Sequence, residues 1–194
     1  MKGILLLMGC VLTTALTNAQ NTLPGYYITQ NNDTVNTQIR LRKGVFGQTT
    51  NDFIKELEVI DSLTGPKVFS PDDIKGYGFT QDGLRVRFAA KPVKNGTKKF
   101  LSPVYVGAKS SLYQYGIRTS GGGGALASQS TFYTFEKSDG SYLFLRDILN
   151  KKFRTELKEF YKDNAEVQAL IDTKLQYWHD LKKDLLQIMI VANR

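Results

Sequence analysis

Paired carboxylates are the residues of this sequence best suited to acid–base chemistry. Asp72 and Asp73 are adjacent, and Glu56 and Glu58 share one face if their segment forms a strand. Glycoside hydrolysis needs two carboxylates about 5–10 Å apart across a cleft, with the pKa of one raised by burial. The sequence places neither pair in a cleft, and a Ser-Pro pair before Asp72 favours a structural role at the start of a short helix. A carboxylate-dependent hydrolase is therefore an alternative function and not the leading one.

The chain has one histidine, His179, and one cysteine, Cys10. A Ser-His-Asp enzyme would have to use His179, but the sequence contains no Gly-x-Ser-x-Gly nucleophile elbow. His179 lies between Trp178 and Asp180 near an expected helix start, and we interpret it as a surface or capping residue. A zinc site would have one histidine and, in a processed chain, no cysteine. We therefore predict no catalytic residue, no metal and no cofactor.

Four consecutive glycines at positions 121–124 are a second candidate, for phosphate binding. They lack the Gly-Lys-Ser/Thr that ends a phosphate-binding loop, and they do not open a helix after a strand. Lys109 and Ser110 supply a Lys-Ser pair without the preceding Gly-Lys step. A run of glycines loses too much backbone entropy inside a strand or helix, so we predict a mobile loop between strands.

Arginines alternate with apolar residues in two segments, around residues 39–42 and 84–88. In a strand this alternation puts the arginines on one face and the apolar residues on the other. If the two strands are neighbours, one face carries Arg40, Arg42, Arg85 and Arg87. The arginine fork matches carboxylate and phosphate groups, so this face is a candidate anion-binding surface. The alternative is an ordinary solvated face of exposed arginines.

The elements that must position these residues are strands from residue 20 to 146. Hairpin turns are predicted at Asp82-Gly83, at Asn95-Gly96 and at residues 138–141, each flanked by alternating or aromatic segments. Residues 53–60 alternate weakly and are predicted as a strand, and residues 70–74 as a short helix. Tyr113 and Tyr115 share a strand face and are predicted to be core residues.

From residue 147 to 194 the apolar residues recur at three- and four-residue steps, which predicts helices. Strands followed by helices indicate an α+β fold: a meandering antiparallel sheet with the C-terminal helices packed on one face. Residues 20–194 are the size of a single domain, β-rich over 20–146 and helical over 147–194. The apolar stretch at residues 188–191 is expected to be buried.

Residues 1–19 read as a secretory signal peptide. Lys2 precedes an apolar run well short of the ~20 residues of a spanning helix, and Ala19 is a small residue before a cut at Gln20. We therefore expect an exported protein of the periplasm or outer membrane, with no transmembrane helix in the mature chain. An alternative cut before Cys10, at a sequence similar to a lipobox, would give a lipid-anchored protein.

The net charge of +8 at pH 7 lies mainly before residue 119. A basic surface favours anionic partners. Outside the cytoplasm these are anionic lipids or glycans, so we do not expect nucleic acid as a partner.

Several segments together resemble a group of uncharacterised secreted proteins of Bacteroidota. The resemblance rests on residues 27–35, with their strand–Asn-Asp-Thr turn–strand pattern, on the Ser-Pro-Asp-Asp-Ile-Lys-Gly motif within residues 69–77, and on residues 100–115 and 157–164. The family often has a cysteine where this chain has Asn164. The resemblance implies no activity, cofactor or catalytic residue. In that phylum, Asp-Ser/Thr-apolar patterns make Thr34 and Ser62 candidate O-glycosylation sites.

The leading functional hypothesis is a non-catalytic cell-envelope protein that binds a partner, such as an envelope protein, or a ligand. A second hypothesis is a periplasmic carrier of lipids or small ligands, with a cavity between the sheet and the helices. A large apolar-lined cavity would favour the carrier, and a cleft with two facing acids would favour the hydrolase.

Overall fold

The computed structural model describes residues 22–41, 50–61, 64–119 and 128–194. They form ten strands whose pairings are all antiparallel. The strands are β1 (Thr22–Thr29), β2 (Thr34–Arg40), β3 (Leu57–Asp61), β4 (Gly65–Phe69), β5 (Ile74–Gln81), β6 (Leu84–Pro92), β7 (Lys98–Val106), β8 (Ser110–Thr119), β9 (Ser128–Lys137) and β10 (Tyr142–Arg146). The helices are α2 (Thr50–Lys55), α3 (Lys151–Phe160), α4 (Ala165–Lys174) and α5 (Leu181–Ala192), with short 3-10 turns η2 (Lys94–Gly96) and η3 (Trp178–Asp180).

The sheet order is β10-β9-β8-β7-β6-β5-β1-β2-β3-β4, so β5 pairs with β1 and not with β4. Only residues 70–73 join β4 to β5, a reach of at most about 18 Å when fully extended. These residues form a turn, in which the N–H of Asp73 donates to the carbonyl of Ser70, so their actual reach is shorter still. In a flat sheet four strand spacings, about 19 Å, would separate β4 from β5. The sheet therefore curls, and the rings of Tyr27 on β1 and Phe69 on β4 meet with centroids 4.8 Å apart.

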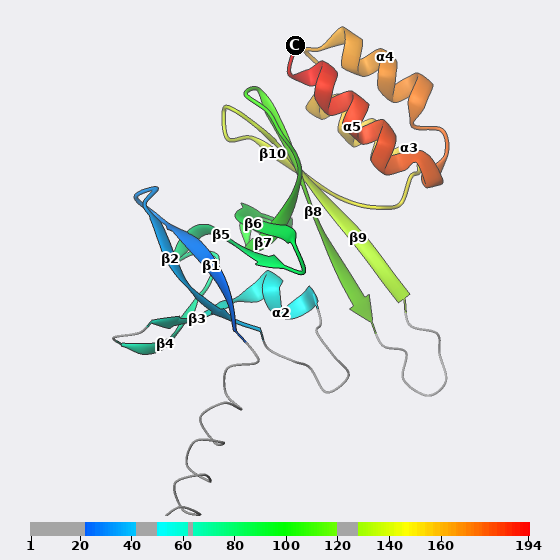
Figure 1. Ribbon diagram of the computed structural model, residues 1–194. Helices are drawn as coiled ribbons and strands as arrows, with labels where there is room; N and C mark the ends of the chain where they lie inside the picture. The colour runs from blue at the N-terminus through cyan, green and yellow to red at the C-terminus, as the bar shows by residue number, and fades with distance from the viewer. Residues whose placement is uncertain (1–21, 42–49, 62–63, 120–127) are drawn as a thin grey trace, which may run out of the picture.

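Strand β7 divides the sheet into two parts. Its residues 98–101 pair with β6, whereas residues 102–106 pair with β8, and the register shifts between Pro103 and Tyr105. Figure 1 shows the result: β1–β6 form a curled unit, and the long strands β8 and β9 run past it, with one end of each near the helices and the other end pointing away from them.

Three clusters of buried side chains stabilise these parts. The first lies inside the curl and includes Ile39, Val59 and Tyr77. The second joins α2 to β7 and β8 and includes Tyr113 and Tyr115, as predicted for core residues. The third joins β8–β10 to the C-terminal helices: Leu112, Tyr133, Phe135 and Leu145 pack with fully buried helical residues such as Leu157, Ile171, Leu185, Ile188 and Met189.

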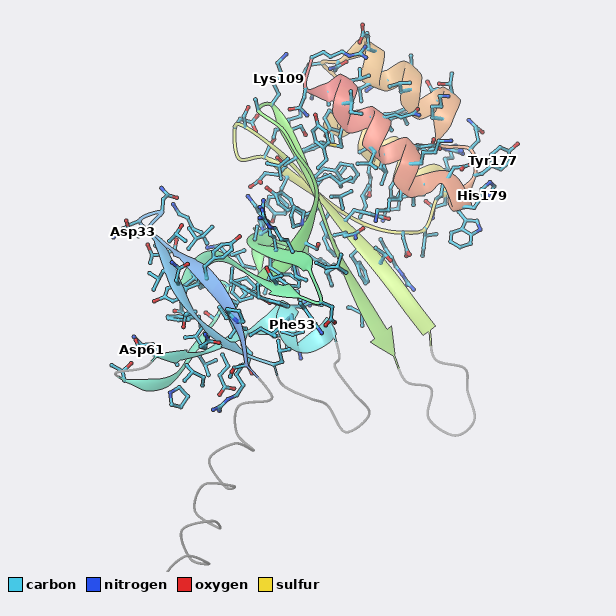
Figure 2. The ribbon with its side chains drawn as sticks, viewed as in Figure 1. Asp33, Phe53, Asp61, Lys109, Tyr177 and His179 are labelled. Carbon is cyan, nitrogen blue, oxygen red and sulfur yellow. The ribbon has the colours of Figure 1, made fainter. Side chains whose placement is uncertain are left out.

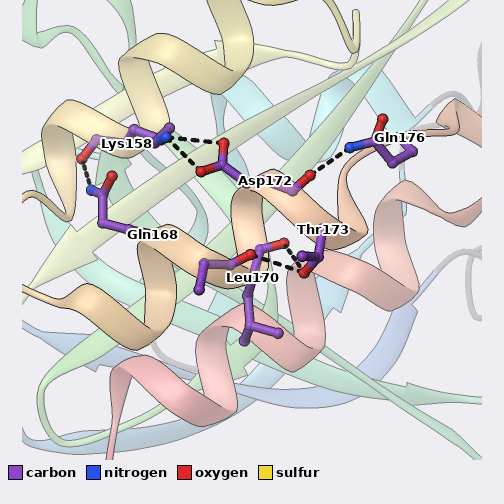
Figure 3. Close-up of polar contacts among 7 residues, drawn as sticks. Lys158, Gln168, Leu170, Asp172, Thr173 and Gln176 are labelled. Atoms are coloured by element: carbon purple, nitrogen blue, oxygen red, sulfur yellow. Dashed lines mark hydrogen bonds and ion pairs between the residues drawn. The ribbon is translucent and has the colours of Figure 1, made fainter.

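Helices α3 and α4 begin at asparagine caps and are joined by a surface ion pair. The side chains of Asn150 and Asn164 accept hydrogen bonds from the N–H groups of Phe153 and Val167 at the starts of α3 and α4. Between these helices, Lys158 Nζ lies 2.7 Å from a carboxylate oxygen of Asp172 (Figure 3). The caps define where the helices begin, whereas the packing of the helices rests mainly on the buried residues of the third cluster.

The α+β class and the antiparallel sheet are confirmed, although the sheet is larger than a simple meander. The three predicted hairpin turns are confirmed as well; Asp82 and Gly83 both have positive φ, as a two-residue turn of this kind requires. Two local predictions are wrong. Phe53 belongs to helix α2, and the strand begins at Leu57. Residues 71–73 form a turn because Ile74 already pairs in β5.

None of the helices in the described residues combines the length and apolar character that crossing a bilayer requires.

Candidate ligand-binding groove

The curled unit holds a groove with a volume of about 820 Å³. This volume lies within the usual range of small-molecule sites, about 300–1,000 Å³. Its lining comes from all six strands β1–β6: Pro24, Gly25, Tyr26, Tyr27, Val35, Asn36, Thr37, Gln38, Val59, Ile60, Asp61, Lys67, Phe79, Thr80, Arg85, Val86 and Arg87. The groove exists because the curl brings β4 back toward β1.

Strand alternation explains the mixed character of the groove. Val59, Phe79 and Val86 belong to the apolar cluster inside the curl. Their neighbours in sequence face the other side of the sheet, and in β6 those neighbours are Arg85 and Arg87. Both sets border the groove, but Val59 and Phe79 are only 2% and 5% exposed. The apolar surface beside the arginines is that of Tyr26, which lies opposite Gly78, as Arg87 does on the other side.

The charged residues of the lining are Lys67, Arg85, Arg87 and Asp61, three basic and one acidic. Among the described residues, neither Arg85 nor Arg87 forms an ion pair or a side-chain hydrogen bond. Asp61, in contrast, accepts a hydrogen bond of 3.1 Å from the N–H of Thr64 in the β3–β4 hairpin. Figure 2 places Asp61 at that hairpin. The two arginines therefore remain available to an anionic ligand.

The four-arginine face is only partly assembled. Strands β2 and β6 are not neighbours, because β1 and β5 lie between them. Arg40 is bound to Glu58, with Nη1 2.7 Å from Oε1. Arg42 lies outside the described residues. The pair Arg85 and Arg87 is what remains of the predicted surface, and it lines the groove.

The candidate acids have structural partners. Asp72 is exposed and lies 3.3 Å from Lys98 Nζ. Asp73 accepts hydrogen bonds of 2.7 Å from both the hydroxyl and the N–H of Ser70, and these bonds lower the pKa of its carboxyl. Glu58 is paired with Arg40. Neither acidic pair lies in the groove, whose one carboxylate is Asp61.

His179 is exposed at the start of α5, as predicted for a surface residue. Its Nε2 lies 3.1 Å from Asp180, and its ring stacks on Tyr177 with centroids 5.6 Å apart. Lys109 and Ser110 lie in the β7–β8 turn, where their N–H groups are bonded to the side chain of Asn193. Within the described residues, no cluster of three His, Cys, Asp or Glu side chains is placed to hold a metal ion.

The remaining predicted positions divide into two groups. Thr34 is exposed at the first position of β2. Cys10, Ala19, Gln20, Ser62 and the glycines at positions 121–124 lie outside the described residues.

Sequence reasoning found Arg85 and Arg87 through their alternation but missed the groove. Tyr27, Asp61 and Lys67 carry no local signal of a shared site, because they meet only through the curl of the sheet. No family model, no curated protein and no solved structure matches this chain.

Proposed function

We propose that this chain is an exported, non-catalytic binding protein of the cell envelope, and that it holds a small amphipathic anion in the groove of β1–β6. The ligand has an apolar body and a carboxylate, phosphate or sulfonate group. The observation that carries the proposal is the juxtaposition, on one face of the sheet and in one hollow, of the partly exposed Tyr26 with the ion-pair-free Arg85 and Arg87.

Physical chemistry supports this ligand class. Apolar lining supplies most of the binding free energy of a pocket, while a few polar groups fix the orientation. The guanidinium presents several N–H donors in a planar fork, which suits an oxyanion better than a neutral group. With Lys67 also in the lining, the basic residues outnumber the single acid.

The other hypotheses have less support. A hydrolase would need a second acid facing Asp61, and the groove lining has none. A carrier with its cavity between sheet and helices would need space where Leu112, Phe135 and Leu157 are fully buried. Export rests on the pattern of residues 1–19, and membership of the Bacteroidota group rests on the motifs quoted above.

A fluorescent fatty acid tests the proposal. Dansyl-undecanoate is titrated against the purified protein, with its neutral methyl ester as the matched ligand. We expect saturable binding of the acid, weaker binding of the ester, and a loss of roughly tenfold or more in affinity for the acid in Arg85→Ala/Arg87→Ala, because charge-assisted hydrogen bonds contribute about 1.5–3 kcal/mol each.

Arg40→Ala is the control, because Arg40 is paired with Glu58 and does not line the groove. Binding should be unchanged in this variant. Val86→Asp should weaken both ligands, since it places a charge in the apolar part of the lining. Equal affinities of the wild type and the double arginine variant, or no binding of either ligand, would overturn the proposal.

A further inference from the structure

The link between α4 and α5 carries two exposed aromatic residues. Trp178, the single tryptophan of the chain, is 73% exposed, and Tyr177 is 65% exposed. Neither belongs to any of the buried clusters of the described residues. Large aromatic side chains are normally packed, so two adjacent exposed ones indicate a surface that is covered in the working protein.

The structure holds this link in place. Leu175 before it and Leu181 after it are 0% and 3% exposed, so both ends are anchored in the core. Arg154 of α3 donates a hydrogen bond of 3.2 Å to the carbonyl of Leu175. Tyr177 stacks on His179, which lies 3.1 Å from Asp180. The aromatic residues therefore project from a fixed turn at one end of the helices, where Figure 2 shows Tyr177 and His179 pointing away from the molecule.

The charges around the link are positive. Lys174, Lys182 and Lys183 are exposed on either side of it, and none forms an ion pair with a described residue. The neighbouring acids are fewer: Asp172 is paired with Lys158, Asp184 is 6% exposed, and Asp180 is a partly exposed carboxylate 3.1 Å from His179. A partner of this surface therefore meets two aromatic rings flanked by three lysines and one partly exposed carboxylate, so the charge of the segment is positive.

We propose that residues 174–183 form a membrane-docking tip, which inserts Tyr177 and Trp178 into the headgroup region of a bilayer that contains anionic phospholipid. Tryptophan and tyrosine favour that region, because each has an apolar body and a polar tip. The lysines lie beside the rings, where they meet lipid phosphates. Lysine is depleted in the cores of protein–protein interfaces, so this combination fits a lipid surface better than a protein partner.

Trp178 makes the test direct, because it alone reports tryptophan fluorescence. The protein is purified with Cys10→Ser in all variants, so that no lipid anchor contributes. It is mixed with vesicles of phosphatidylcholine alone or with phosphatidylglycerol added. We expect a blue shift of the emission and sedimentation with the anionic vesicles, and neither with the neutral ones.

Matched variants identify the surface. Trp178→Ala and Lys182→Glu/Lys183→Glu should each reduce sedimentation at least fivefold, whereas Lys94→Glu/Lys109→Glu, with the same change of charge elsewhere, should not. Arg85→Ala/Arg87→Ala should sediment like the wild type, which separates this proposal from the groove. An unshifted tryptophan emission with anionic vesicles, as expected for a tip that binds only protein, would overturn the membrane-docking proposal. An equal loss of sedimentation in Lys182→Glu/Lys183→Glu and in Lys94→Glu/Lys109→Glu would overturn it as well.

Discussion

The side chain of Asn193 binds both the N–H and the carbonyl group of Ser110. Its Oδ1 accepts from the N–H of Ser110 at 3.1 Å, and its Nδ2 donates to the carbonyl of Ser110 at 2.9 Å. The same two atoms also bind the N–H of Lys109 and the carbonyl of Met189. One side chain thus joins the end of α5 to the β7–β8 turn, about 80 residues earlier in the chain.

Asn193→Ala removes all four of these hydrogen bonds. We expect the free energy of unfolding to fall by about 2–3 kcal/mol, because partly buried backbone groups lose their partners. Urea unfolding followed by far-UV circular dichroism measures this. Gln176→Ala is the control, since Gln176 forms one exposed bond to the carbonyl of Asp172; an equal loss in both variants would contradict the prediction.

Gly107 leaves room for the Asn193 side chain. A Cβ at position 107 would lie 2.1 Å from Asn193 Oδ1, so Gly107→Ala must displace the amide. We expect Gly107→Ala to cost about as much stability as Asn193→Ala, and the double variant to cost little more than either. A double-mutant cycle in urea measures the coupling, and additive losses would show that the two residues act independently.

Tyr161 makes stability depend on alkaline pH. Its hydroxyl lies 2.7 Å from Ser110 Oγ, and burial raises its pKa to about 12. Unfolded tyrosine has a pKa of about 10, so between pH 10 and 12 the native state retains a proton that the unfolded chain releases. The free energy of unfolding should therefore fall as the pH rises through this window, by on the order of 2 kcal/mol from Tyr161 alone.

Urea unfolding at a series of pH values from 8 to 12 checks this prediction. Tyr161→Phe should give a shallower decrease above pH 10, and the exposed Tyr177→Phe should leave the decrease unchanged. Both variants should keep some pH dependence, because burial also raises the pKa of Tyr77. Identical slopes in the wild type and Tyr161→Phe would contradict the prediction.

Lys91 joins the two parts of the sheet. Its Nζ lies 2.5 Å from Glu136 Oε2 and 4.8 Å from the centre of the Tyr113 ring, with both charged side chains three-quarters buried or more. Burial lowers the pKa of Lys91, but its contacts with Glu136 and Tyr113 outweigh burial and leave the pKa above its usual value. This contact links β6 to β9 across β7 and β8.

Lys91→Met should lower the free energy of unfolding by about 1–3 kcal/mol, because it leaves the carboxylate of Glu136 largely buried without its partner. Adding Glu136→Gln should recover part of the loss. Lys152→Met is the control: its partner Glu156 lies 3.7 Å away on an exposed helix face, and such pairs contribute less than about 0.5 kcal/mol. Similar losses in the two lysine variants would rule out a special role for Lys91.

Local chemistry made some elements predictable. Asn95 and Gly96 have φ of 62° and 76°, values that these residue types tolerate, so the turn could be identified without tertiary context. Asn164 caps α4, a position at which asparagine is among the preferred residue types. The alternation of β6 also identified Arg85 and Arg87 correctly as neighbours on one face.

The site as a whole was not predictable in this way. Nothing near β5 indicates that it pairs with β1, because that pairing depends on the curl and on contacts such as Tyr27 with Phe69. The division of β7 between its partners β6 and β8 likewise depends on pairing with other strands and has no signal in its own sequence. The sequence alone therefore suggested that Arg85 lies beside Arg40. In the structure Arg85 lines a groove with Lys67, and Arg40 is paired with Glu58.

Two glycines in the curled unit test how tightly its strands pack. A Cβ on Gly25 would lie 2.6 Å from the backbone oxygen of Gly78, which cannot move without separating β1 from β5. A Cβ on Gly78 would meet only the ring end of Tyr26, at 2.8–2.9 Å among its nearest atoms, and that side chain can rotate. Gly25→Ala should therefore cost about 2 kcal/mol or more and Gly78→Ala less than half as much, although alanine is normally the better strand residue. Urea unfolding of both variants decides the matter, and equal losses would mean that the Tyr26 ring is as firmly held as the backbone.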